Sequence, residues 1–192
     1  MVGHNWNDME AKITKLQHQT KSYLSEIKEM VDKLNEPARM DSISYFTYSL
    51  NISHDPEGES LCLGSYHIHN LGNRAITNPS VCIKVSKESP FSFSGRYVYG
   101  DFKQSLKVAD GWERTNEKTN KEEFWLRPLG KASIEPNETI SFSNFQVTWS
   151  AKESYAGSIL GFTYGDQMPD GIDVINPINL NGTVQKQEDE NE

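Results

Sequence analysis

The sequence contains little cysteine, no excess of basic residues and no long apolar run, and each absence excludes a class of protein. Cys62 and Cys82 are the only cysteines among 192 residues, too few for a disulfide-stapled scaffold, so we expect both to be reduced and buried. No stretch approaches the roughly 20 consecutive apolar residues of a membrane-spanning helix. The formal charge is −8, from 19 basic and 27 acidic residues, and no basic stripe could neutralise phosphates. We therefore expect neither membrane insertion nor nucleic-acid binding.

The motifs of common catalytic and cofactor sites are missing as well. The chain has no glycine-rich phosphate loop, no dinucleotide fingerprint, no Gly-x-Ser-x-Gly elbow and no His-Glu-x-x-His. We therefore expect a protein that is not an enzyme and binds no cofactor. The segment Met1–Trp6 lacks the cationic and apolar regions of a Sec signal peptide. This predicts a cytoplasmic protein, or one released without that signal, for example as part of a virion.

A heptad repeat occupies residues 6–36. Its side chains recur at alternating spacings of three and four, and no proline interrupts them before Pro37. The stripe consists of Trp6, Met9, Ile13, Leu16, Thr20, Tyr23, Ile27, Met30 and Leu34. This spacing predicts one long amphipathic α-helix with coiled-coil heptads. We expect the helix to end near Pro37, because proline cannot continue a helix.

The residues at the e and g positions, which flank this stripe, indicate what the helix packs against. A parallel dimer normally pairs a charge at a g position with the opposite charge at the e position five residues later, and no such pair occurs here. Leu24 and Val31, both at e positions, widen the stripe in its second half. The pattern favours a trimer or larger bundle of copies, with docking on the chain's own β domain or on a partner's helix as alternatives. The predicted oligomerisation residues are Ile13, Leu16, Thr20, Tyr23, Ile27, Met30 and Leu34.

Residues 42–184 change from a helical period to the period of two that strands have. Apolar and polar residues alternate between turn segments such as Asp55–Gly58. Residues 42–69 are expected to form a hairpin, and the step from Phe142 to Phe145 breaks strict alternation and predicts a β-bulge. We therefore expect a mainly β domain, an antiparallel β-sandwich of immunoglobulin-like or jelly-roll-like type. A disordered acidic tail is expected at 185–192.

Aromatic residues make up 10% of the sequence and can fill a core or bind a ligand. Trp149 lies within a long alternation and is expected in the core. Trp112 lies in the polar segment Asp110–Arg114, so we expect it to be exposed. An exposed ring can stack on the face of a sugar while polar side chains bond its hydroxyl groups. The candidate ligand-binding residues for a glycan are Trp112, Arg114, Tyr97 and Tyr99.

Two groups of side chains have some features of metal sites. His67 and His69 share one face of a strand, but zinc needs a third and usually a fourth ligand. Asp166, Asp170 and Asp173 lie in a loop with glycine and proline, yet their spacing does not match the calcium loop of an EF-hand. We expect half-exposed strand histidines and a solvated acidic turn, with no metal bound.

The predicted layout, a helix that oligomerises followed by a β-sandwich, is that of a binding head on a stalk. Repeated weak sites on such heads gain avidity. We therefore expect a non-enzymatic assembly or attachment protein, similar in architecture alone to phage or prophage structural proteins and bacterial surface-associated proteins. The alternative is a monomeric intracellular adaptor or immunity-type protein, and a third is a carbohydrate-binding module. The predicted partners are copies of the same chain, another protein or a glycan.

Overall fold

The computed structural model describes residues 3–34, 41–55, 57–100, 111–150 and 152–184. The chain divides into two units, Met1–Ala38 and Arg39–Glu192. Within the described residues, no helix is both long and apolar enough to cross a membrane. The predicted acidic tail at 185–192 lies outside the described residues, as do the side chains of Trp6 and Leu34.

The first unit is a single helix, α1 (Gly3–Leu34), of 32 residues. At a rise of 1.5 Å per residue its length is about 48 Å. The hydroxyl groups of Thr14 and Thr20 donate hydrogen bonds to the carbonyl oxygens of Glu10 and Leu16, one turn earlier, at 2.9 and 2.8 Å. Both hydroxyl groups are therefore hydrogen-bonded within the helix. The predicted helix is confirmed, and it begins three residues earlier than the sequence indicates.

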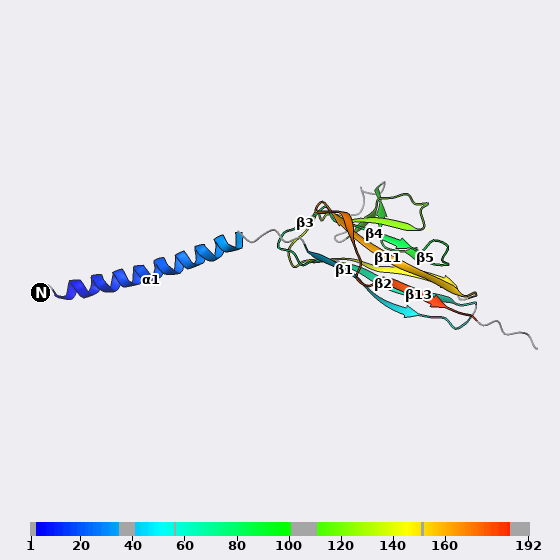
Figure 1. Cartoon of the computed structure of the whole chain (residues 1–192), viewed down its shortest axis with the longest axis horizontal. Helices are drawn as coiled ribbons and strands as arrows, with labels where there is room; N and C mark the ends of the chain where they lie inside the picture. The colour runs from blue at the N-terminus through cyan, green and yellow to red at the C-terminus, as the bar shows by residue number, and fades with distance from the viewer. Residues whose placement is uncertain (1–2, 35–40, 56, 101–110, 151, 185–192) are drawn as a thin grey trace, which may run out of the picture. The chain divides into compact units, whose positions relative to one another are not determined.

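The second unit consists of strands that form two facing sheets and one small pair (Figure 1). One sheet has the order β1-β2-β10-β5, and the other has the order β12-β11-β4-β8-β7-β6, with β13 also pairing with β11. The strands are β1 (Ser42–Asn51), β2 (Glu59–Asn70), β3 (Ile76–Thr77), β4 (Ser80–Val85), β5 (Ser92–Ser94), β6 (Val98–Tyr99), β7 (Trp112–Arg114), β8 (Glu123–Pro128), β9 (Ser133–Ile134), β10 (Thr139–Ser150), β11 (Tyr155–Gly165), β12 (Met168–Asp173) and β13 (Ile178–Gly182). The predicted β-sandwich preceded by one helix is confirmed.

The predicted hairpin and bulge are both present. Strands β1 and β2 pair antiparallel from Ser42 opposite Asn70 to Asn51 opposite Leu61. The register between β10 and β2 shifts between Phe142 and Phe145, and Asn144 there has a φ of 60°, a left-handed conformation that asparagine tolerates. The extra residue lets Phe142 and Phe145 both face the core, where they are 1% and 0% exposed.

The centre of the core is the side chain of Tyr66, which reaches from β2 to the opposite sheet. Its ring meets that of Phe46 edge to face at 5.0 Å between centroids, and its hydroxyl lies 2.8 Å from Oγ1 of Thr163 on β11. Gly161 makes room for the ring, because a Cβ there would lie 2.3 Å from Cε2 of Tyr66. Burial raises the pKa of Tyr66 to about 12, so the hydroxyl stays protonated. Tyr66 therefore joins the two sheets through packing and a hydrogen bond.

Replacing Tyr66 with phenylalanine is expected to lower the free energy of unfolding by about 1–2 kcal/mol, because the buried Thr163 hydroxyl loses this partner. Adding Thr163→Val should recover part of the loss, since both partners are then apolar. Urea unfolding of the two single variants and the double variant measures the coupling. Simple addition of the two single losses in the double variant would contradict the predicted coupling.

Candidate functional site

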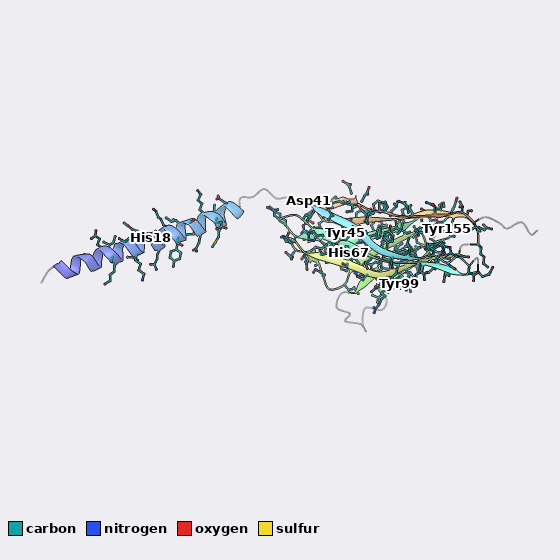
Figure 2. All side chains as sticks on the ribbon, turned by 90° about the horizontal axis from the view of Figure 1, so that it is seen from below. His18, Asp41, Tyr45, His67, Tyr99 and Tyr155 are labelled. Atoms are coloured by element: carbon teal, nitrogen blue, oxygen red, sulfur yellow. The ribbon has the colours of Figure 1, made fainter. Side chains whose placement is uncertain are left out.

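The described part of the predicted oligomerisation stripe is exposed along α1. The apolar side chains of the stripe, together with Leu24 and Val31 beside it, are 46–61% exposed. The stripe members among them are Met9, Ile13, Leu16, Tyr23, Ile27 and Met30. Thr20, which interrupts the apolar series, has its hydroxyl bonded to the carbonyl of Leu16. His18 (Figure 2) occupies an f position, on the opposite side of the heptad from the a and d seam.

The four predicted glycan-binding residues lie together, because β6 pairs with β7. The expectation that Trp112 is exposed is nevertheless wrong. Trp112 is 5% exposed, its ring packs edge to face against Phe142 at 5.6 Å, and its Nε1 donates to the carbonyl of Ser141 at 3.0 Å. The polar neighbours of Trp112 in sequence are misleading, because pairing of β7 with β8 turns its ring toward the opposite sheet.

Arg114 is also buried, at 4% exposure, and its guanidinium holds the loop between β7 and β8. Its Nε donates to Oδ1 of Asn116 at 3.0 Å, and its Nη2 donates to the carbonyls of Glu117, at 3.0 Å, and Asn120. The guanidinium also lies over the ring of Phe124, at 4.4 Å from its centroid. These contacts give Arg114 a structural role in the loop.

Tyr97 and Tyr99 remain half-buried beside Arg114. Their rings meet in a T-shaped contact at 5.7 Å, and Nζ of Lys118 lies 4.3 Å from the centroid of Tyr99. Two of the four predicted side chains are therefore partly accessible. A role for them in ligand binding stays a prediction.

His67 lies on the outer face of the four-stranded sheet, stacked on the ring of Tyr45 at 4.9 Å (Figure 2). Its Nε2 lies 2.8 Å from Oγ1 of Thr47, and its Nδ1 lies 2.7 Å from Oγ of Ser141. Both ring nitrogens therefore have hydroxyl partners. His69 is held in a similar way, with Nδ1 2.7 Å from the hydroxyl of Thr139.

The expected acidic turn is shorter than the sequence indicated. Only Asp166 lies in the turn, whereas Asp170 and Asp173 belong to β12 and, three residues apart on a strand, point to opposite faces. Oδ2 of Asp166 accepts hydrogen bonds from Oγ1 of Thr77 and Nδ2 of Asn78, both at 2.7 Å. Across the part of the chain that the structure describes, no group of three or more His, Cys, Asp or Glu side chains could hold a metal ion.

Three half-buried aromatic side chains form what we call the aromatic platform, on the outer face of the seven-stranded sheet. They are Trp125 of β8 and Phe162 and Tyr164 of β11. The rings of Trp125 and Tyr164 are 5.0 Å apart and inclined at 35°. Between these strands lies β4, whose Cys82 is opposite Trp125 on one side and Phe162 on the other. These large neighbours explain why Cys82 is only 3% exposed although it faces outward.

Polar groups flank the platform on two sides. Glu123 accepts hydrogen bonds from Nε1 of Trp125, at 3.2 Å, and from Nζ of Lys84, at 2.9 Å. The hydrogen bond from Lys84 lowers the pKa of Glu123, which keeps it a carboxylate at neutral pH. Fixed hydrogen-bonding groups thus stand at the edge of an apolar ring face, an arrangement suited to ligands that are apolar on one side and polar on the other.

A cleft of about 550 Å³ lies beside the platform, lined in part by Ser80, Glu113 and Arg127. Ser80 pairs with Tyr164 in the sheet, so the cleft and the platform are contiguous. Nε of Arg127 donates to buried Glu113 at 2.6 Å, while the Arg127 side chain stays 50% exposed. The rest of its guanidinium can therefore donate hydrogen bonds to a ligand.

The two cysteines do not suit nucleophilic chemistry. Burial raises the pKa of Cys62 to about 11 and that of Cys82 to about 12. Both groups are therefore thiols at neutral pH, whereas nucleophiles and metal ligands are thiolates.

Neither a protein-family model nor a curated protein matches this chain. Among solved structures, the GH20 exo-β-N-acetylglucosaminidase from Vibrio harveyi is 10% identical with a TM-score of 0.30, and covers 75% of this chain and 18% of its own. The family 3b carbohydrate-binding module from the biomass-sensoring system of Clostridium clariflavum is 14% identical with a TM-score of 0.31, and covers 71% of this chain and 98% of its own. The chain thus spans less than a fifth of the length of the Vibrio enzyme. Likenesses at these scores do not extend to ligands or activity.

Acidification is expected to destabilise the sandwich partly through His67. Burial lowers the pKa of His67 from its ordinary value of 6.5, so the unfolded chain binds a proton more readily than the folded one. The stability from neutral His67 is therefore present above the unfolded pKa and is lost as the pH falls toward the folded pKa. Melting temperatures measured from about pH 7.5 to about pH 5.5 should fall less steeply in His67→Gln than in the wild type. Equal slopes would show that His67 does not contribute.

Proposed function

We propose that this protein is a non-enzymatic assembly or attachment protein, in which α1 joins copies of the chain and the sandwich is a binding head. The observation that carries the proposal is the stripe along α1. A lone helix of this kind is marginally stable in water, and its apolar side chains, from Met9 to Val31, are about half exposed. Association of several copies would bury these side chains and stabilise the helix.

The threonine within the stripe is compatible with burial. Thr20 occupies an a position, where an unpaired hydroxyl would cost roughly 1–3 kcal/mol on burial. That hydroxyl already donates to the carbonyl of Leu16 at 2.8 Å, so it can enter an apolar seam without losing a partner. The polar position is therefore a weak point in the seam and does not interrupt it.

The width of the stripe favours more than two copies. Leu24 and Val31 are 61% and 46% exposed at e positions, and a narrow two-stranded seam would leave much of both uncovered. In a trimer or larger bundle each helix contacts two neighbours, which covers e positions as well as a and d.

Replacing Ile13 and Ile27 with lysine is expected to give a monomer of 21.8 kDa in dilute solution, whereas the wild type has a multiple of that mass by light scattering at the same concentration. Each lysine removes an apolar side chain from the seam and adds a charge, costing roughly 3 kcal/mol or more, which weakens association over a hundredfold. The matched control places lysines at Ala11 and Ser25, two f positions outside the seam, and should keep the wild-type mass.

A second test uses the shortened chain 39–192. Every side chain of the described core belongs to the sandwich unit, so this part of the chain keeps its core without α1. It should be monomeric at concentrations where the full chain is not. A wild-type chain that is monomeric throughout would falsify the assembly proposal. A lower melting temperature of the Ile13→Lys, Ile27→Lys variant, at unchanged mass, would instead support the monomeric adaptor or immunity-type alternative.

A second candidate function, glycan binding by the head, is favoured by the aromatic platform. The ring faces of Trp125 and Tyr164 can stack on the C–H face of a sugar, while Arg127 and Glu123 bond its hydroxyl groups. Copies joined by α1 would present several such shallow sites together, and avidity would then compensate for weak single-site binding.

Titration with soluble oligosaccharides of glucose, xylose and N-acetylglucosamine tests the platform. Trp112 and Trp149 are 5% and 2% exposed, so within the sandwich a change in tryptophan fluorescence on binding reports chiefly on half-buried Trp125. The titration uses a Trp6→Phe background, and binding by Trp125→Ala, which removes this reporter, is measured by calorimetry. Trp125→Ala and Tyr164→Ala should each weaken binding about tenfold, the equivalent of roughly 1.4 kcal/mol of ring contact. Tyr45→Ala, which removes a half-buried ring from the other sheet, is the control. Binding that survives Trp125→Ala but not Tyr45→Ala would place the site elsewhere.

A further inference from the structure

Strand β1 forms an edge of the four-stranded sheet, and the first half of this edge is closed by the chain itself. The carbonyl of Ser44 accepts a hydrogen bond from the amide of Ile175 at 2.9 Å. The amide and carbonyl of Phe46 bond to Oδ1 and Nδ2 of Asn176, both at 2.8 Å. These bonds show that even-numbered residues of β1 direct their backbone groups away from β2.

The second half of the same edge is open. By the alternation of an antiparallel strand, Tyr48 and Leu50 direct their amides and carbonyls outward, as Phe46 does. Ile52 follows the last residue of β1, and the amide of the next residue, Ser53, donates to Oγ of Ser60 on β2 at 3.0 Å, so the alternation extends to Ile52. No described residue forms a backbone or side-chain hydrogen bond to these outward groups. We call residues 48–52 the open edge.

The side chains of the open edge are apolar and uncovered. They follow Ser44 and Phe46 on the inner face of the sheet, yet Tyr48, Leu50 and Ile52 are 45%, 44% and 37% exposed. No charged residue, proline or bulge protects the strand between Ser42 and Ile52, although natural sheets usually protect their edges with such features. An unprotected edge with free backbone groups and apolar side chains is a template for an added strand.

We infer that the open edge pairs antiparallel with the same edge of a second copy of this chain, about a two-fold axis at Leu50. In this register Leu50 lies opposite Leu50 of the second copy, and Tyr48 lies opposite Ile52. Each of the three residues then exchanges both of its outward hydrogen bonds, and the apolar side chains meet on one face. Sliding the second copy toward Phe46 would bring it against Asn176, which limits the pairing to the open edge.

The absence of charged side chains supports a second copy as the occupant, and the small size of the contact sets its strength. The chain carries a net charge of −8, but the open edge is neutral, so the pairing brings no like charges into register. The interface is a few residues long, well below the area of a stable dimer. The association is therefore weak and concentration-dependent.

Disulfide trapping tests the register directly in the full-length chain. The Ile13→Lys, Ile27→Lys background removes association through α1, so failure of this inference and failure of the assembly proposal are distinguishable. Opposed residues of a hydrogen-bonded antiparallel pair have Cα atoms about 5.5 Å apart, within the range that a disulfide spans. With oxidised glutathione as the oxidant, Leu50→Cys should give a covalent dimer. Native Cys62 and Cys82 are 0% and 3% exposed and should not react.

The matched control is Leu63→Cys, on the outer face of neighbouring β2, where Leu63 is 39% exposed. It has the same chemistry and similar accessibility but does not face its own copy in this register, so it should stay monomeric under the same oxidant. Equal cross-linking of the two variants, or none in Leu50→Cys, would overturn the inference. Absence of cross-linking in Leu50→Cys would instead favour an extended segment of another protein as the strand that pairs with the open edge.

Analytical ultracentrifugation of the protein without an introduced cysteine provides an independent readout. In the same background the average mass should rise with protein concentration, and Leu50→Lys should abolish the rise while Leu63→Lys leaves it. A mass that stays at 21.8 kDa up to millimolar protein would contradict a second copy at the open edge.

Discussion

Tyr66 joins the two sheets, and the faces that the sandwich presents follow from that contact. The ring occupies the space above Gly161, and its hydroxyl bonds to Thr163, which fixes the inward side of both β2 and β11. Because alternate residues of a strand face opposite sides, His67 must then face outward on one sheet, and Phe162 and Tyr164 must face outward on the other. The aromatic platform is thus the reverse side of the strand that Tyr66 anchors.

In a single copy, the head would bind a ligand weakly and the apolar stripe of the helix would stay uncovered. The aromatic platform lies on the outer face of a sheet and would cover a ligand from one side, so one head would bind weakly. The stripe on α1 is exposed and gains stability only when something covers it. Association of copies would meet both requirements together, since the same event buries the stripe and places several platforms on one assembly. Assembly through α1 and glycan binding by the head would thus support each other, although each has its own test.

Periodicity predicted the features that depend on one segment of chain, and failed where burial depends on strand pairing. The heptads gave α1, and the skipped step between Phe142 and Phe145 gave the bulge. The polar neighbours of Trp112 in sequence predict an exposed ring, whereas β8 and the opposite sheet decide its surroundings. The sequence does not indicate the aromatic platform for a related reason. Apolar residues occupy both faces of β11 from Ile159 to Tyr164, and sequence alone does not show which face is the outer one.

Symmetry decides how the two self-association surfaces would combine. A parallel bundle has one rotation axis along α1, whereas pairing at Leu50 needs a two-fold axis through the open edge. With two copies, one axis can serve both contacts and the assembly closes. With three copies, no two-fold axis lies along the bundle, so symmetric edge pairing of every head would join heads of different bundles and build a larger assembly. If the width of the stripe at Leu24 and Val31 selects three copies, the open edge would be a contact between bundles.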